Sequence, residues 1–212
     1  MIVEVRAVPP FHKNGFVLGS EKARQVVIVD PGDEVDQLLD LVQARHLSVT
    51  HILLTHAHVD HVTGVGRAKR ALGVPICLHR DDNFLYEAAV EQAAFFGLKA
   101  ERQPPVDHFY DPDEVFALGE YEISVHHTPG HCPGGVCLAV GLVGARKEDL
   151  FVGDTLFAGS IGRTDLPGAD HATLLRSIRE VLFAFGDAAR VYPGHGPTTT
   201  IGQERRSNPF LV

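Results

Sequence analysis

The chain lacks the features that mark secreted and membrane-spanning proteins. Only three of its 212 residues are cysteine, an odd number at wide spacing that does not make a disulfide framework. No apolar run reaches roughly 18 residues, the length that a membrane span requires. The opening sequence, MIVEVRAVPPFHK, has no basic stretch followed by an apolar core, so no secretory signal is expected. These absences predict a cytoplasmic protein without a membrane partner.

Basic residues are outnumbered by acidic ones, with 19 Lys and Arg against 27 Asp and Glu and a formal net charge of −8. Binding to a phosphate backbone needs a basic face, so this balance disfavours nucleic acid as a partner. The sequence has no internal repeat and no low-complexity segment, and its proline-rich stretches at 9–10 and 103–105 are short enough to be loops. We therefore expect a single domain over residues 1–212.

Strand-like and helix-like patterns alternate along the chain. β-Branched or alternating segments predict strands over 2–8, 25–30, 50–54, 75–78, 114–127, 135–141, 149–153 and 189–193. Apolar residues at helical spacing predict helices after Asp33, over 63–72, over 81–97 with Asp81 or Asp82 as the cap, and after Asp170. Helices must cover sheet faces, so the order favours an α/β protein with two packed sheets and helices outside. Composition alone leaves other α/β layouts open.

The clearest chemical feature is the segment 55–61, T-H-A-H-V-D-H, which follows a predicted strand. His56 and His58 are two residues apart, so they point the same way from extended backbone. Asp60 and His61 follow where a helix is expected to begin. Neutral imidazole is the commonest metal ligand in proteins, so this short loop could supply two adjacent metal ions.

Three further candidates follow later strands, and each has a glycine neighbour that allows a tight turn: His131, Asp154 and His195. With the loop ligands they make five histidines and two aspartates, a donor set suited to zinc, iron or manganese. Asp154 is the natural bridge, because one carboxylate can offer an oxygen to each of two ions. A lone histidine after a strand is usually structural, but chance rarely produces the whole set.

The remaining histidines are expected to be structural or exposed, and at most one of the adjacent pair His126 and His127 could reach the site. Cys132 is next to His131, but the neighbouring residue along a strand points away, which argues against a ligand role. Cys77 and Cys137 lie in apolar strands and are expected in the core.

The H-x-H-x-D-H motif formed by His56, His58, Asp60 and His61 resembles the signature of the metallo-β-lactamase fold superfamily. The later single ligands occur in that family's order, and the resemblance covers nearly the whole chain. Within the superfamily the sequence looks most like the glyoxalase II-like branch, and most of all its small bacterial single-domain hydrolases. The segments that carry this likeness are GDTLF at 153–157, GRTD at 162–165, PGHGP at 193–197 and NPF at 208–210.

The resemblance implies an αββα four-layer sandwich of two mixed sheets flanked by helices, with the metals at one edge. It implies two divalent metal ions, zinc foremost and iron or manganese as alternatives. The ligands carried over are His56, His58 and His131 for the first metal, Asp60, His61 and His195 for the second, and Asp154 as the bridge. Full-length glyoxalase II enzymes add a C-terminal helical domain that binds glutathione, and this domain is not expected in the about 17 residues after His195.

The implied reaction is hydrolysis of a small acyl thioester, as in a hydroxyacylglutathione hydrolase. A hydroxide bridging two metals about 3.5–4 Å apart would attack the carbonyl, and Asp60 is the candidate to orient it and move a proton. The main alternative is an oxidoreductase resembling the persulfide dioxygenases, in which one iron is held by His56, His131 and Asp154. A β-lactamase or a nuclease is a third class, and the PGHGP form favours the hydrolase.

Arg163 has two interpretations. It clamps a carboxylate of the substrate, or it pairs with Asp165 and braces the glycine-rich loop. We favour the structural role.

Overall fold

The computed structural model describes all residues 1–212 and divides them into two compact units. The first unit comprises Met1–Tyr110 and Leu118–Glu120, and the second comprises Asp111–Ala117 and Tyr121–Val212. One six-stranded sheet belongs chiefly to each unit, and a two-stranded hairpin accompanies the second. The expectation of a single domain over residues 1–212 stays a prediction.

The sheet of the first unit combines antiparallel and parallel pairing. Its order is β1-β2-β3-β4-β5-β6, antiparallel from β1 to β3 and parallel from β3 to β6. The strands are β1 (Ile2–Arg6), β2 (Gly15–Ser20), β3 (Gln25–Val29), β4 (Ser48–Leu53), β5 (Ile76–Leu78) and β6 (His108–Phe109). Because β3 and β4 are parallel, the residues that follow both strands meet at one edge of the sheet.

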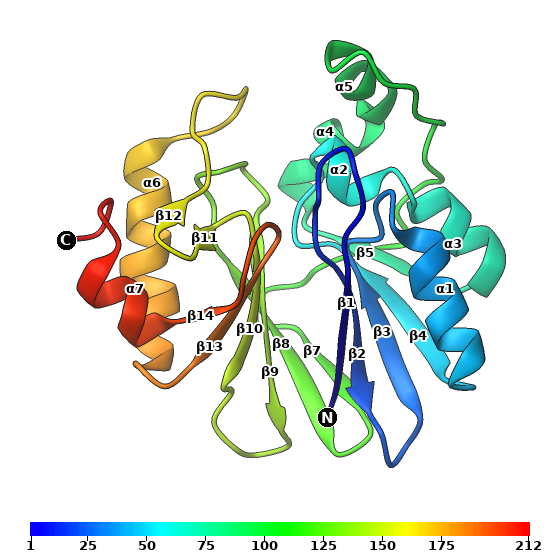
Figure 1. The fold of residues 1–212 in the computed structure, drawn as a ribbon, viewed down its shortest axis with the longest axis horizontal. Helices are drawn as coiled ribbons and strands as arrows, with labels where there is room; N and C mark the ends of the chain where they lie inside the picture. The colour runs from blue at the N-terminus through cyan, green and yellow to red at the C-terminus, as the bar shows by residue number, and fades with distance from the viewer. The chain divides into compact units, whose positions relative to one another are not determined.

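Short helices connect and cover these strands (Figure 1). They are α1 (Val35–Ala44), α2 (Val59–Val62), α3 (Val65–Leu72), α4 (Asn83–Glu87) and α5 (Ala89–Phe95), with a 3₁₀ turn at Arg80–Asp82. Helix α1 buries Leu38 and Val42 against Val17 and Ile28 of the sheet. Removing such apolar side chains from water contributes about 1.5–3 kcal/mol each, which fixes α1 on the sheet.

The sheet of the second unit has the order β14-β13-β10-β9-β8-β7. Its strands are β7 (Val115–Leu118), β8 (Tyr121–His127), β9 (Val136–Leu142), β10 (Asp149–Gly153), β13 (Arg190–Pro193) and β14 (Thr199–Thr200). Strand β10 pairs with β13 in parallel and with β9 in antiparallel orientation. The separate hairpin consists of β11 (Leu156–Phe157) and β12 (Ser160–Ile161).

Helical segments cover this second sheet (Figure 1). They are α6 (His171–Arg176), a π-helical turn (Ser177–Val181), a 3₁₀ turn (Leu182–Phe185) and α7 (Ile201–Ser207). Leu174, Ile178 and Ile201 share a buried cluster with Leu150 and Val191 of the strands. Asp170 accepts a hydrogen bond from the N–H of Thr173 at 2.7 Å, which confirms its predicted capping role.

The predicted fold class, mixed α/β with two sheets flanked by helices, is confirmed. Strand β2 was not predicted, because Gly15 and Gly19 weaken a strand pattern and its residues are buried without alternation. The single helix predicted over 81–97 is two helices, since Ala88 departs from helical geometry with ψ near 15°. Asp33 does not cap α1, which begins after Glu34.

Cys77, Cys132 and Cys137 are all buried and none of them forms a disulfide, in agreement with the sequence analysis. None of the helices is long and apolar enough to cross a membrane.

Candidate metal centre

The predicted ligands form two sets, one in each unit. The first set follows β4, where the chain leaves the sheet and enters α2. His58 is the N-cap residue of α2 with extended backbone (φ −69°, ψ 152°), and Asp60 and His61 lie in the helix itself. The change from extended to helical backbone turns these side chains toward the same neighbourhood as His56.

The three imidazoles of this set lie against one another. The ring of His56 is 4.9 Å from that of His58 and 4.0 Å from that of His61, measured between centroids. Oδ2 of Asp60 is 3.7 Å from Nε2 of His61. His56 and His61 are almost completely buried, with exposed fractions of 1% and 0%. Three imidazoles and a carboxylate so close together are a typical donor set for a borderline divalent metal.

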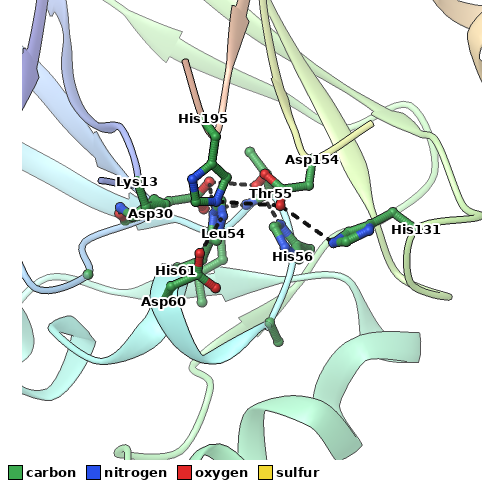
Figure 2. A network of polar contacts seen from close by, with 12 residues as sticks. Lys13, Asp30, Leu54, Thr55, His56, Asp60, His61, His131, Asp154 and His195 are labelled. Atoms are coloured by element: carbon green, nitrogen blue, oxygen red, sulfur yellow. Dashed lines mark hydrogen bonds and ion pairs between the residues drawn. The ribbon is translucent and has the colours of Figure 1, made fainter. Parts of the chain in front are cut away.

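Asp30, which the sequence analysis did not select, orients the first set (Figure 2). It follows β3, and its Oδ1 accepts the backbone N–H of Thr55 at 2.7 Å. Its Oδ2 accepts the hydroxyl of Thr55 at 2.5 Å and lies 3.0 Å from Nδ1 of His61. A carboxylate on one imidazole nitrogen fixes the ring and directs the other nitrogen to a metal. No signal in the sequence selected this contact, which depends on the parallel pairing of β3 with β4 in the folded sheet.

The backbone of the ligand loop is held by three side chains from outside it. Asp82 occupies the N-cap position of α4, as expected, but makes no side-chain capping bond there, and its carboxylate instead accepts the N–H of Ala57 at 3.0 Å. Gln92 accepts the N–H of Val59 at 3.2 Å and donates to the carbonyl of Ala57 at 3.1 Å. The hydroxyl of Tyr110 contacts both backbone groups of Leu54 at 3.1 Å. The bonds of Asp82 and Gln92 satisfy backbone groups of Ala57 and Val59 that no helix or strand pairs. The N–H of Leu54 also bonds to the carbonyl of Cys77 at 3.0 Å, so Tyr110 adds to that pairing.

The second set lies in the second unit and centres on Asp154 (Figure 2). Oδ2 of Asp154 is 3.7 Å from Nε2 of His131 and 3.6 Å from Nε2 of His195. Asp154 follows β10 and His195 follows β13, and these strands are parallel neighbours. Their carboxyl ends are joined by a hydrogen bond from the N–H of Gly194 to the carbonyl of Gly153 at 2.8 Å.

A backbone carbonyl orients His131. Nδ1 of His131 is 2.9 Å from the carbonyl oxygen of Arg163, which directs Nε2 toward Asp154. Gly162 allows this approach, because a Cβ at that position would lie 1.9 Å from the carbonyl of Asp154 and 3.1 Å from Nδ1 of His131. Only glycine fits so close to another segment of backbone.

Arg163 donates two hydrogen bonds to the carboxylate of Asp165, at 2.6 and 2.7 Å. The guanidinium lowers the pKa of the Asp165 carboxyl to about 2. Both side chains are exposed, so the pair braces the loop at its surface. This contact agrees with the structural role favoured for Arg163.

His126 and His127 have structural contacts. His126 packs edge-on against Phe185 and bonds to Ser124, and burial lowers the pKa of its imidazole. His127 contacts the carbonyl of Pro133 at 2.8 Å.

Both sets suit the metals that the sequence predicts. Their donors are imidazole nitrogens and carboxylate oxygens, the ligands of zinc, iron and manganese sites. The Nδ1 atoms of His61 and His131 contact a carboxylate and a backbone carbonyl, as is usual for metal-bound histidines. Among the predicted ligands, the structure brings His56, His58, Asp60 and His61 together in one unit and His131, Asp154 and His195 together in the other.

A more distant similarity connects the chain to ETHE1 from Myxococcus xanthus. That structure superposes with a TM-score of 0.81 at 26% identity, over 99% of this chain and 84% of the other.

Known proteins of closer similarity are metallo-hydrolases. The chain is 38% identical to hydroxyacylglutathione hydrolase GloC of Haemophilus influenzae, over 100% of this chain and 98% of that protein. BLEG-1 B3 metallo-beta-lactamase has a TM-score of 0.90 and 36% identity over the whole of both chains. The di-iron-bound form of TTHA1623 has a TM-score of 0.86 and 40% identity, over 99% of this chain and 100% of the other. Residues 8–195 match the metallo-beta-lactamase superfamily, and the chain belongs to that superfamily.

Proposed function

We propose that this protein is a metal-dependent hydrolase that cleaves a small acyl thioester, in the manner of a hydroxyacylglutathione hydrolase. The observation that carries the proposal is that each ligand set contains a histidine whose Nδ1 atom has a fixed partner. Nδ1 of His61 contacts the carboxylate of Asp30, and Nδ1 of His131 contacts the backbone carbonyl of Arg163. The similarity to GloC over the full chain supports the thioester as substrate class. The superfamily match supports metal-dependent hydrolysis.

We infer that the two sets serve one centre with two divalent ions, zinc foremost and iron or manganese as alternatives. The proposed assignment is His56, His58 and His131 for one ion, Asp60, His61 and His195 for the other, and Asp154 as the bridge. Its support is the family resemblance, and the di-iron form of TTHA1623 supports a centre of two ions in a similar protein.

Such ions, when bound, act as Lewis acids and lower the pKa of water toward neutrality. The chain's own residues supply the rest. Asp60 is placed beside His61 with a side chain 13% exposed, so it can orient an attacking water and accept its proton. Asp30 keeps the His61 ring in one orientation throughout. A thiolate leaves with little protonation, so no strong general acid is required of the site.

A second candidate is an oxidoreductase resembling the persulfide dioxygenases, with one iron on His56, His131 and Asp154. The similarity to ETHE1 from Myxococcus xanthus keeps this candidate open. β-Lactam hydrolysis is a third candidate, because of the similarity to BLEG-1 B3 metallo-beta-lactamase.

The deciding experiment uses protein purified without oxygen, with its metals counted per chain. We expect two equivalents of metal and release of free thiol from S-lactoylglutathione. Oxygen consumption with glutathione persulfide, one iron per chain and no thiol release would establish the second candidate instead. Hydrolysis of nitrocefin without thiol release would establish the third. The cytoplasmic location and the absence of nucleic-acid and membrane partners stay predictions.

A further inference from the structure

A buried ion pair lies in the first unit, outside the candidate ligands. Nζ of Lys13 is 2.6 Å from Oε1 of Glu34, and each side chain is only 2% exposed. Lys13 belongs to the connection between β1 and β2, and Glu34 is the residue before α1. Burying two charges is costly even when they pair, so such a pair is weak support for stability alone. Its position indicates what else it does.

The pair holds the turn at 30–34. Nζ of Lys13 also donates to the backbone carbonyl of Asp30, and Oε1 of Glu34 accepts the N–H of Gly32 at 2.9 Å. Asp30 has left-handed backbone with φ of 49°, a conformation that a non-glycine residue keeps only when its surroundings impose it. A Cβ on Gly15 would lie 1.9 Å from Oε1 of Glu34, so the pair is enclosed tightly.

The same turn touches the ligand segment at several points. The carboxylate of Asp30 contacts His61, as described above. A Cβ on Gly32 would lie 2.0 Å from the carbonyl oxygen of Asp60 and 2.9 Å from Cε of Lys13. The carbonyl of Pro31 accepts the N–H of Gly64 at 3.0 Å. The turn is therefore packed between the ion pair on one side and the segment that carries Asp60 and His61 on the other.

We propose that Lys13 is a positioning residue for the metal ligands, acting with Glu34 through the 30–34 turn on His61 and Asp60. The inference rests on the proposed metal-dependent function. It assigns to the ion pair the task of keeping Asp30 in the one backbone conformation from which its carboxylate meets both Thr55 and His61. Figure 2 shows Lys13 beside Asp30.

The test is the variant Lys13→Met, which keeps the length of the side chain and removes its charge. Lys69→Met is the matched control, because Nζ of Lys69 also donates to a carbonyl, of Val74 at 3.0 Å, and to a carboxylate, of Asp107 at 2.8 Å. Metal-free full-length proteins are titrated with Zn²⁺ against a chelator, and with Co²⁺ while visible absorption is recorded. We expect Lys13→Met to weaken Zn²⁺ binding about ten-fold and to change the Co²⁺ spectrum. Lys69→Met should retain both properties.

The double variant Lys13→Met/Glu34→Gln separates positioning from folding. It removes both charges, so no unpaired charge is buried, and glutamine still offers an oxygen to Gly32. If the folded double variant still binds Zn²⁺ about ten-fold more weakly than the unaltered protein, the result supports a positioning role for Lys13. This holds even if the single variant Lys13→Met does not fold. Wild-type Zn²⁺ affinity in either folded variant overturns it. If the unaltered protein binds neither Zn²⁺ nor Co²⁺, the proposed function fails, whereas unchanged binding in the variants refutes only the role of Lys13.

Discussion

The Oδ2 atom of Asp30 lies 3.0 Å from Nδ1 of His61, although the two residues are 31 positions apart in the chain. Asp30 follows β3 and His61 lies in α2, beyond the neighbouring parallel strand β4. The contact fixes which imidazole nitrogen of His61 a metal would meet. It also joins the ligand loop to the turn that Lys13 and Glu34 hold.

Replacing Asp30 with asparagine should weaken metal binding, because an amide cannot accept hydrogen bonds through both oxygen positions as the carboxylate does. Loss of such a partner typically lowers metal affinity by about 10–100-fold. The change is measured as Zn²⁺ retained per chain after dialysis against a graded chelator series. Asp36→Asn is the control, since Asp36 forms only an exposed pair with Arg67. Equal retention by both variants would contradict the orienting role of Asp30.

Alanine at Gly162 should disrupt the second ligand set. Its Cβ would meet the carbonyl oxygen of Asp154 at 1.9 Å, so the 155–162 segment must move away from His131. We expect loss of S-lactoylglutathione hydrolysis together with weaker Zn²⁺ binding. Gly144→Ala is the control, because it has left-handed backbone with φ of 73° but no atom within 4 Å of the added Cβ. Its activity should match the unaltered protein even though alanine there must adopt left-handed backbone. Comparable losses in both variants would contradict a specific steric role for Gly162.

Asn208 of the NPF segment should matter for stability. It is completely buried, and its Nδ2 donates to the carbonyl of Ser160 at 3.0 Å and to Oε2 of Glu204 at 2.9 Å. Alanine at this position would leave the Ser160 carbonyl and the Glu204 carboxylate without the hydrogen bonds that Asn208 donates. Asn208→Ala should therefore lower the free energy of unfolding by about 1–3 kcal/mol. Chemical denaturation gives this value, and Ser207→Ala at an exposed neighbouring position serves as reference. A midpoint unchanged from the reference would exclude this role.

The exposed pair of Arg163 and Asp165 makes a prediction about pH. The guanidinium holds the pKa of the Asp165 carboxyl at about 2, so Arg163→Met should raise it toward the ordinary value of about 3.9. Because the pKa of Asp165 is lower in the folded protein than in the unfolded chain, the pair stabilises the folded state fully at pH values above the ordinary carboxyl pKa. This stabilisation is lost as the pH falls toward the folded-state pKa of about 2. NMR titration of the carboxyl resonance measures both values. An unshifted resonance in the variant would show that Arg163 does not control this carboxyl.

His131→Ala should abolish turnover of S-lactoylglutathione instead of only raising KM. His131 belongs to the proposed ligands, and a lost ligand removes transition-state stabilisation. Steady-state kinetics with added Zn²⁺ measures kcat and KM separately. His171→Ala, at an exposed position on α6, should leave both unchanged. A His131→Ala variant with normal kcat would remove this residue from the proposed centre.

The residue pattern alone was enough to identify the family and the candidate ligands. The H-x-H-x-D-H spacing places four donors in a few residues, and local backbone geometry is enough to group them. The sequence also predicted most strands and the cap at Asp170, because periodicity and capping depend on neighbouring residues. Strand β2 was not predicted because it depends on residues far from it in the chain. Its buried glycines fit a strand only because β1 and β3 pair with it on both sides.

The contacts that hold those ligands in place depend on the packing of segments far apart in the chain. Three contacts show this. Asp30 and His61 are 31 positions apart in the chain, Arg163 and His131 are 32 apart, and Lys13 and Glu34 are 21 apart. No spacing rule predicts such pairs, because the distance between them depends on strand order, register and the packing of glycines such as Gly32 and Gly162. Local chemistry can name a metal ligand, but its orientation depends on contacts that form only when distant segments are packed together.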